Sequence, residues 1–185
     1  YQEELAYRAL HDPLTGLPNR ALFRDRLHHA LVRLRRHTGR VAVLFVDLDR
    51  FKLVNDGMGH GVGDAVLVET AQRLAEAARA EDTVARFGGD EFTILCEDAG
   101  EEGARLVADR VLEAFTHPFT HDGQEFQLSA SVGIRVNALA TADPDLLLRD
   151  ADIALYSAKE NGRERVEVFD AEAKMPGFDL LATEQ

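Results

Sequence analysis

Apolar and polar residues recur along the chain with two periods, and each period predicts one kind of element. Apolar positions three or four residues apart, the spacing of one helix face, mark the segments 23–36, 62–78, 103–115 and 144–162. Asn19 precedes the first segment and Asp143 precedes the last, and both residue types favour a helix N-cap. Pro144 and Gly162 stand where proline commonly begins a helix and glycine commonly ends one. We therefore predict a helix over each segment.

Continuous or alternating apolar runs predict the strands, which we place at residues 41–48, 83–87, 92–97, 126–136 and 165–169. The run 41–48 is almost unbroken and rich in valine, which is typical of a strand buried on both faces of a helix-covered sheet. In the run 126–136 every second residue is apolar, so we expect this strand to bury one face. Two glycines join the second strand to the third, which predicts a hairpin.

The order of these elements is β-α-β-β-α-β with an added helix and strand, which predicts an α+β domain with helices flanking one sheet. We place this domain at residues 11–170 and expect a polar loop at 56–61. Residues 1–10 are helix-prone and charged but lack a start signal, so we interpret them as the remnant of an upstream signalling helix. Residues 171–185 have weak periodicity and are expected to form a linker or tail.

Composition limits the classes of function. With 185 residues, 45% hydrophobic and 29% charged, the chain has the makeup of one globular domain. Its net charge of −12 argues against a nucleic-acid polymer as partner, because such a surface needs many lysines and arginines. No apolar stretch approaches the roughly 18 residues of a membrane span. The single cysteine, Cys96, lies in an apolar run, which indicates a core position. A lone cysteine without a disulfide partner is typical of a reducing compartment. We therefore expect a cytoplasmic domain without direct membrane contact, whose parent protein can itself be membrane-anchored.

Two acidic clusters at strand ends carry the candidate chemistry. Two glycines and two carboxylates meet in the run 86–92, at the tip of the predicted hairpin. Glycine lets a backbone approach a bulky anion, and carboxylate oxygens are hard ligands suited to Mg²⁺ or Mn²⁺. Upstream, Asp47 and Asp49 end the strand 41–48. If Asp47 and Asp90 lie side by side, their mutual repulsion favours a divalent cation between them.

Each of these features also has a structural interpretation. Gly-Gly-Asp is ordinary chemistry for a hairpin turn, and Asp47 and Asp49 can alternate between solvent and a helix cap. Lys52 can be a solvated surface lysine. Lys159 and Arg163 can stabilise the C-terminal end of the last helix through its dipole. The functional interpretation gains weight because all of these features occur together.

Several segments, in order and without a gap over residues 10–170, resemble the GGDEF family. They are 12–20 (DPLTGLPNR), 46–64 (VDLDRFKLVNDGMGHGVGD), 86–92 (RFGGDEF), 129–134 (SASVGI) and 151–163 (ADIALYSAKENGR). The resemblance implies the fold of polymerase palms and nucleotidyl cyclases. It also implies the activity of a diguanylate cyclase, which joins two GTP molecules into cyclic di-GMP and releases two pyrophosphates.

The resemblance further implies a role for each acidic residue. The metal ligands are the carboxylates of Asp47 and Asp90 together with the Leu48 carbonyl. Glu91 lies beside the reacting ribose hydroxyl, and either acid of the tip, Asp90 or Glu91, can help to remove its proton. Mg²⁺ is the expected ion, and Mn²⁺ can replace it.

The same resemblance assigns the residues that bind the substrate. Gly88 and Gly89 let the backbone close on the phosphates. The β and γ phosphates are held by the cations Lys52, Lys159 and Arg163.

Two further residues match the positions that read the base. Asp64 matches the guanine-reading carboxylate and Asn55 its amide partner. Members that accept ATP in one half-site carry serine at the Asp64 position, so we expect GTP. Alternatively, Asp64 is the N-cap of the helix that contains Val66.

The family's mechanism implies two chains that face each other, because each 3′ hydroxyl attacks the α-phosphorus of the other GTP. We therefore expect an active homodimer, brought together by an upstream sensory segment. Arg79 and Asp82 match the family's RxxD inhibitory site, which predicts feedback by cyclic di-GMP. The bare motif also fits Arg149 and Asp152, and such an i, i+3 pair is commonly a surface salt bridge.

Two other functions share parts of this pattern. A non-catalytic GGDEF domain can bind GTP or cyclic di-GMP as a signal to an attached phosphodiesterase domain, but such domains usually lose signature residues that this chain retains. A nucleic-acid polymerase palm shares the carboxylates, but this chain lacks the basic surface and the length.

Overall fold

The computed structural model describes residues 1–171, so the predicted tail lies, from residue 172 onward, outside the described residues. Its centre is a five-stranded sheet of order β2-β3-β1-β6-β7, in which β6 and β7 are parallel and the other neighbours antiparallel. These strands are β1 (Val41–Leu48), β2 (Thr83–Gly88), β3 (Glu91–Glu97), β6 (Ala130–Asn137) and β7 (Val166–Val168). A separate hairpin joins β4 (Phe119–His121) to β5 (Gln124–Phe126).

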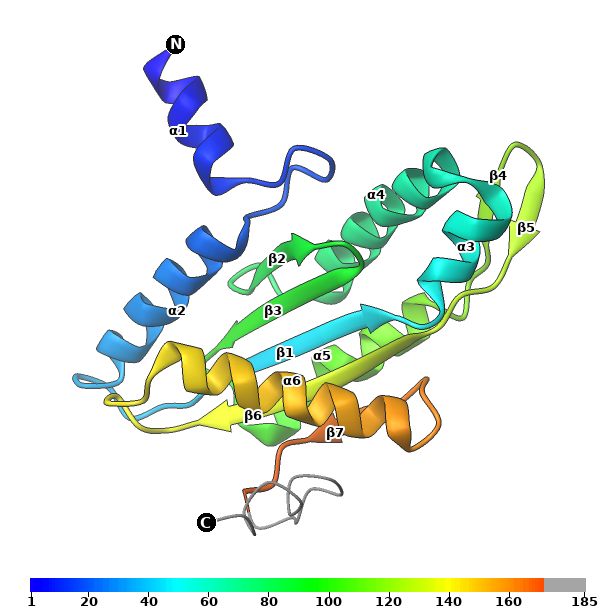
Figure 1. The fold of residues 1–185 in the computed structure, drawn as a ribbon. Coiled ribbons are helices and arrows are strands. Elements are labelled where there is room, and N and C mark those ends of the chain that lie inside the picture. Colours follow the sequence, from blue (N-terminus) through cyan, green and yellow to red (C-terminus); the bar gives the residue numbers. More distant parts are fainter. Residues whose placement is uncertain (172–185) are drawn as a thin grey trace, which may run out of the picture.

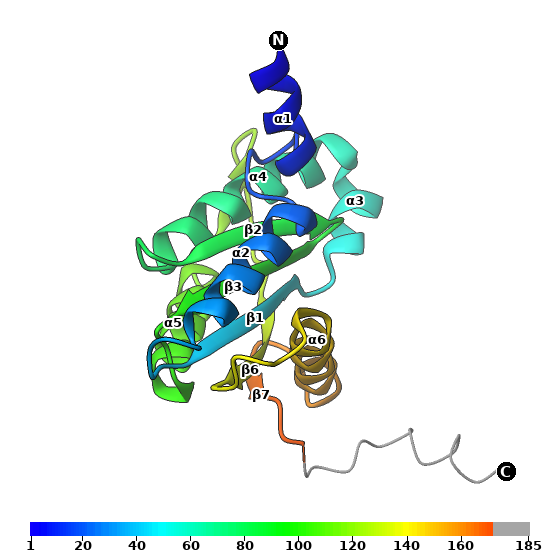
Figure 2. The same ribbon diagram turned by 90° about the vertical axis from the view of Figure 1, so that its left-hand side faces the viewer.

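Helices cover both faces of the sheet (Figure 1). The helices of the described residues are α1 (Gln2–Leu10), α2 (Arg20–Arg33), α3 (Phe51–Met58), α4 (His60–Ala77), α5 (Glu101–Ala114) and α6 (Pro144–Glu160). α2 and α6 bury apolar side chains against one face, and α4 and α5 bury theirs against the other (Figure 2). The predicted α+β class is confirmed.

Strand β1 lies between the two cores. Its residues Val41, Val43 and Phe45 belong to the core beneath α2 and α6. The alternate residues, from Ala42 to Leu48, belong to the core beneath α4 and α5. All eight residues are buried, so the prediction of a strand covered on both faces is correct. By the same alternation, Asp47 faces the side of α2 and α6.

Strand β6 lies very close to α6, and this corrects the prediction of a single strand over 126–136 with one buried face. The segment forms the end of β5 and then, after residues 127–129, β6, and the first five residues of β6 are all buried. A Cβ built on Gly133 would lie 2.2 Å from the Leu155 nitrogen and 2.3 Å from the Ala151 oxygen. Glycine therefore lets α6 cover the face that alternation had assigned to solvent.

The predicted polar loop at 56–61 is also wrong. α3 runs through Met58 and α4 begins at His60, with only Gly59 between them. Phe51 and Val54, one helical turn apart, anchor α3 in the core. The glycines of this segment hid the helical pattern, while the break itself falls at Gly59, whose φ is 91°.

Helix α1 projects away from the sheet and has no buried residue (Figures 1 and 2). Its interpretation as the remnant of an upstream signalling helix stays a prediction. Within residues 1–171 no helix has both the length and the apolar character needed to span a bilayer.

Candidate functional site

Asp47 is the centre of the candidate site. It lies directly opposite Glu91 in the register of β1 and β3, so the end of β1 meets the hairpin tip. On its other side it forms an ion pair with Lys159, from the last turn of α6. The Asp47 side chain is 9% exposed and that of Lys159 is 32% exposed. The structure thus brings together residues from three distant parts of the chain.

The carboxylates of Asp47 and Asp90 interact closely. Burial, and then the neighbouring Asp90 carboxyl, raise the pKa of Asp47 to about 7, although the Lys159 ammonium opposes this shift. Oxygen Oδ1 of Asp47 is buried and accepts no hydrogen bond. Buried oxygens are rarely left without a partner, so this atom fits a bound cation.

The donor set is that of a magnesium site completed by a ligand. Among residues 1–171, no three side chains of the His, Cys, Asp and Glu types are grouped to hold an ion by themselves. Mg²⁺ commonly takes one or two carboxylates from the protein and the rest of its oxygens from phosphates and water. Asp47 and Asp90 fit that pattern.

Glycines and an arginine shape the hairpin tip. Gly88 and Gly89 have φ of 144° and 50°, in the region that other residues rarely adopt. Nε and Nη2 of Arg86 donate to the Gly89 carbonyl at 3.0 and 2.9 Å. Nη1 of Arg86 donates to Asp12 at 2.9 Å, which ties the turn before α2 to the tip. Asp12 and Arg86 belong to the motifs 12–20 and 86–92, but neither motif by itself predicts a role for them.

A second acidic pair lies beside the first. Burial, then Asp152 and Asp90, raise the pKa of Glu91, while Arg20 and Lys159 lower it. Burial likewise raises the pKa of Asp152, and Lys159 and Arg20 oppose the shift. Asp152 on α6 therefore belongs to the electrostatic surroundings of the tip, which sequence reasoning did not predict.

The residues predicted to read the base lie on two adjoining helices. Asn55 is on α3, and Asp64 is an exposed residue of the first turns of α4. Oδ1 of Asn55 lies only 1.9 Å from where a Cβ of Gly63 would be, so the absence of a side chain at Gly63 makes room for Asn55 beside Asp64. Because α4 already begins at His60, Asp64 is not its N-cap. Lys52, at the second position of α3, is exposed.

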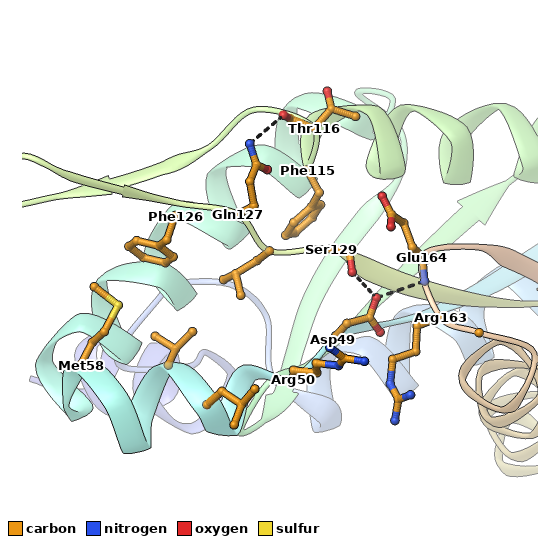
Figure 3. Close-up of a pocket in the computed structure, with 14 residues that line it drawn as sticks. Asp49, Arg50, Met58, Phe115, Thr116, Phe126, Gln127, Ser129, Arg163 and Glu164 are labelled. Carbon is orange, nitrogen blue, oxygen red and sulfur yellow. Dashed lines mark hydrogen bonds between the residues drawn. The ribbon is translucent and has the colours of Figure 1, made fainter.

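Arg163 lies in a loop at the edge of the site. It lines a pocket of about 750 Å³ between α3, the end of α5 and the segment before β6 (Figure 3). Asp49 is in the same wall, and it is buried against this loop and not exposed as a surface residue. The alternative that Asp49 faces solvent is therefore wrong. Asp49 does not cap the following helix either, because the N-cap of α3 is Arg50 and no side chain caps that helix.

The predicted inhibitory pair lies at the other end of the hairpin. Arg79 and Asp82 form two side-chain hydrogen bonds of 2.9 and 3.2 Å, and Arg79 also donates to the Glu97 carbonyl at 2.8 Å. The Asp82 side chain is fully buried, whereas that of Arg79 is 29% exposed. In this structure Arg79 is therefore the member of the pair that a ligand can reach.

Comparisons with known proteins agree with this geometry. Residues 9–165 match the family model described as "GGDEF: Diguanylate cyclase, GGDEF domain". The chain is 44% identical over 160 residues to the bifunctional diguanylate cyclase/cyclic di-GMP phosphodiesterase MucR, and 44% identical over 161 residues to the diguanylate cyclase TpbB, both from Pseudomonas aeruginosa. Each match covers 86% of this chain, but 23% of MucR and 37% of TpbB. The cyclic di-GMP phosphodiesterase PdeR of Escherichia coli is 36% identical over 97% of this chain and 27% of PdeR.

Solved structures give the same result. A truncated TpbB that comprises only the GGDEF domain superposes with a TM-score of 0.81 at 41% identity, covering 86% of this chain and 94% of that one. The coiled coil and GGDEF domain of DgcB from Caulobacter crescentus, in complex with c-di-GMP, superposes with a TM-score of 0.83 at 25% identity. That match covers 90% of this chain and 89% of DgcB.

Proposed function

Because the chain belongs to the GGDEF domain family, we propose that it is a diguanylate cyclase domain, which condenses two GTP molecules into cyclic di-GMP and releases two pyrophosphates. The observation that carries this proposal is the meeting of Asp47 with the intact glycine tip. Asp47 has a buried oxygen without a partner, and Asp90 lies close enough to raise its pKa. A divalent cation relieves both features.

Two sets of residues are proposed to bind the triphosphate: the ligands of the metal ion and the cationic side chains. Asp47, Asp90 and the Leu48 carbonyl would hold Mg²⁺. The bound ion would supply positive charge to the phosphate oxygens. Lys159, which forms an ion pair with Asp47, would hold the β and γ phosphates together with Lys52 and Arg163. These cations stabilise the charge that develops on the leaving pyrophosphate.

The glycine tip and the adjoining acids act on the nucleotide that reacts. Gly88 and Gly89 carry no side chain, so the backbone can approach the phosphates. Glu91 lies at the tip, where a carboxylate can accept the proton of the ribose 3′ hydroxyl. Asn55 and Asp64 present an amide and a carboxylate to the guanine edge, whose N1–H and amino group are donors.

One chain holds one GTP, so the reaction requires two chains with their sites face to face. We propose a homodimer that forms within a larger signalling protein, since MucR and TpbB extend well beyond the region of similarity. Holding two bound substrates together supplies several kcal/mol of the required barrier lowering. Turnover per chain should therefore rise with protein concentration.

Feedback by the product is part of the proposal. Arg79 is partly exposed and has a planar fork that fits a guanine edge or a phosphate. The side chain of Asp82 is fully buried and holds Arg79 in place. Arg79→Ala should abolish inhibition by cyclic di-GMP and leave the initial turnover unchanged. Inhibition that persists in this variant would place the product site elsewhere.

A second candidate is a regulatory domain that binds GTP or cyclic di-GMP without turnover. The match to PdeR, a phosphodiesterase by name, favours it, because that match covers 97% of this chain. The intact metal and tip residues favour catalysis.

One experiment separates the two candidates. The protein is incubated with GTP and Mg²⁺, at several protein concentrations, and the products are separated chromatographically. Catalysis predicts cyclic di-GMP and pyrophosphate from the intact protein and neither from Asp90→Ala. GTP that is bound but not consumed, at concentrations where the chain is dimeric, would instead support the regulatory domain.

A further inference from the structure

The second aspartate of the Asp47-Leu48-Asp49 run has no free oxygen. Oδ1 of Asp49 accepts the Ser131 hydroxyl at 2.6 Å. Oδ2 accepts the Ser129 hydroxyl at 2.6 Å and the backbone N–H of Glu164 at 3.1 Å (Figure 3). Asp49 is 5% exposed and Ser131 is completely buried. A carboxylate engaged by three donors, from β6, from the segment just before β6 and from the 163–164 loop, is an anchor between them and not a vacant ligand for a cation.

The loop that Asp49 holds is strained. Arg163 and Glu164 have φ of 63° and 47°, the left-handed region that residues with a Cβ avoid. Two consecutive residues of this kind persist only where surrounding contacts fix them. The backbone N–H of Arg163 donates to the Ala158 carbonyl at 2.9 Å, and that of Glu164 donates to Asp49. One contact ties the loop to α6, and the other ties it to the end of β1.

We propose that Asp49 is a positioning residue: its carboxylate fixes the Arg163–Glu164 turn and thereby presents the Arg163 guanidinium to the terminal phosphates of GTP. This inference rests on the proposed function, in which Arg163 binds those phosphates. It gives the two aspartates different tasks. Asp47 faces the cation, and Asp49, two residues further, fixes the cationic side chain that meets the other end of the triphosphate.

The first test needs no nucleotide. Hydrogen exchange of the Glu164 amide, followed by NMR, reports directly on the bond to Asp49. Asp49→Ala should increase its exchange rate at least about 10-fold, since the amide loses its acceptor. Asp49→Asn should restore much of the protection, because its remaining oxygen can accept from Glu164 while the Ser131 hydroxyl rotates to accept from the amide. Glu164→Gln, which keeps the backbone N–H, is the matched control and should leave the loop protected.

The second test measures binding of a GTP analogue with a non-cleavable α–β bridge, and of GMP, both in Mg²⁺. Arg163→Ala should weaken the analogue about 10-fold, the effect of one charge-assisted hydrogen bond, and leave GMP unchanged. Asp49→Ala should show the same pattern. The double variant should bind the analogue no more weakly than Arg163→Ala, because both changes remove one interaction.

The outcomes separate the inference from the function on which it rests. If Arg163→Ala does not change binding of the analogue, the proposed role of Arg163 in the enzyme fails. If it weakens the analogue but Asp49→Ala does not, or if Asp49→Ala weakens GMP equally, Asp49 is not a positioning residue. Should Asp49→Ala fail to fold, the double change Ser129→Ala/Ser131→Ala keeps the carboxylate and removes its side-chain donors. That variant should show a smaller loss with the same selectivity for the analogue over GMP, and equal losses would contradict the inference.

Discussion

Asp12 and Arg86 form an ion pair, with 2.9 Å between Oδ1 of Asp12 and Nη1 of Arg86, that joins the turn before α2 to the hairpin tip. Burial raises the pKa of Asp12, but hydrogen bonds from Thr15 and the charge of Arg86 outweigh it, so the pKa lies below its ordinary value. Such a carboxyl stabilises the folded state above its unfolded pKa, and the contribution is lost as the pH falls. We expect Asp12→Asn to lower the free energy of unfolding by about 1–3 kcal/mol near neutral pH.

The difference in unfolding free energy between Asp12→Asn and the original protein should shrink as the pH falls below about 4, where the unfolded chain takes up a proton at Asp12. It should disappear once the pH lies below the lowered pKa of Asp12 in the folded state. Urea unfolding at several pH values measures it. Asp145→Asn is the matched control, because the pair of Asp145 with Arg24 is exposed and should contribute little. A loss for Asp12→Asn that does not vary with pH would contradict the role of the charge.

Asp47 and Asp90 should destabilise each other when no cation is bound. Burial and Asp90 raise the pKa of Asp47 to about 7, so between about pH 4 and about pH 7 the folded state binds a proton that the unfolded state lacks. Stability therefore falls as the pH rises through this window. Asp90→Asn should raise the Tm near pH 8 in a chelator, by about 2–4 °C for each 1 kcal/mol gained, and raise it less near pH 5.

Thermal unfolding with and without Mg²⁺ and GTP checks this prediction. Ligands should stabilise the original protein and reverse the order of the two Tm values. Asp109→Asn, at an exposed position of α5, should change neither value. A lower Tm for Asp90→Asn near pH 8 without metal would show that the two carboxylates do not repel.

Gly63 should control how well the site binds guanine. A Cβ at this position would lie 1.9 Å from Oδ1 of Asn55 and 3.3 Å from Cζ of Phe51, so Gly63→Ala must displace Asn55. We expect GTP binding to weaken by about 10-fold, the effect of one lost hydrogen bond to a buried partner, with less preference over ATP. Competition binding measures both quantities.

Gly61→Ala is the control for this change, because a Cβ there has nothing within 4 Å and the residue lies in the same helix. It should bind GTP as the original protein does. Equal losses in both variants would assign the effect to helix α4 as a whole.

The sequence patterns predicted the elements whose periodicity is strong. The unbroken run of β1 and the stripes of α2, α4 and α5 placed the sheet and its covering helices correctly. The patterns failed where small residues replace the expected apolar ones. Glycines obscured α3, and Ser131 and Gly133 made one face of β6 read as solvent-exposed although α6 covers it.

For the candidate site, too, the sequence predicted some relationships and not others. The sequence motifs predicted that Asp47 and the hairpin tip form one site, and the register of β1 with β3 places Asp47 opposite Glu91 of the tip. Pairings across the fold could not be foreseen, because no local pattern relates Asp12 to Arg86 or Asp49 to the Glu164 backbone. Each of those contacts depends on how distant loops pack.

Gly133 should be essential for the packing that brings Lys159 to Asp47. A Cβ there would lie 2.2 Å from the backbone nitrogen of Leu155, and neither β6 nor α6 can move without disturbing the core. Gly133→Ala should therefore lower the free energy of unfolding by at least about 1–3 kcal/mol, as overpacking does. Gly103→Ala, whose Cβ would make an ordinary 3.5 Å contact with Ala99, should instead stabilise α5 by about 0.5–1 kcal/mol. Urea unfolding measures the free energy of unfolding of both variants. Equal stability for the two would mean that α6 can shift away from β6, so that Gly133 does not fix the position of Lys159.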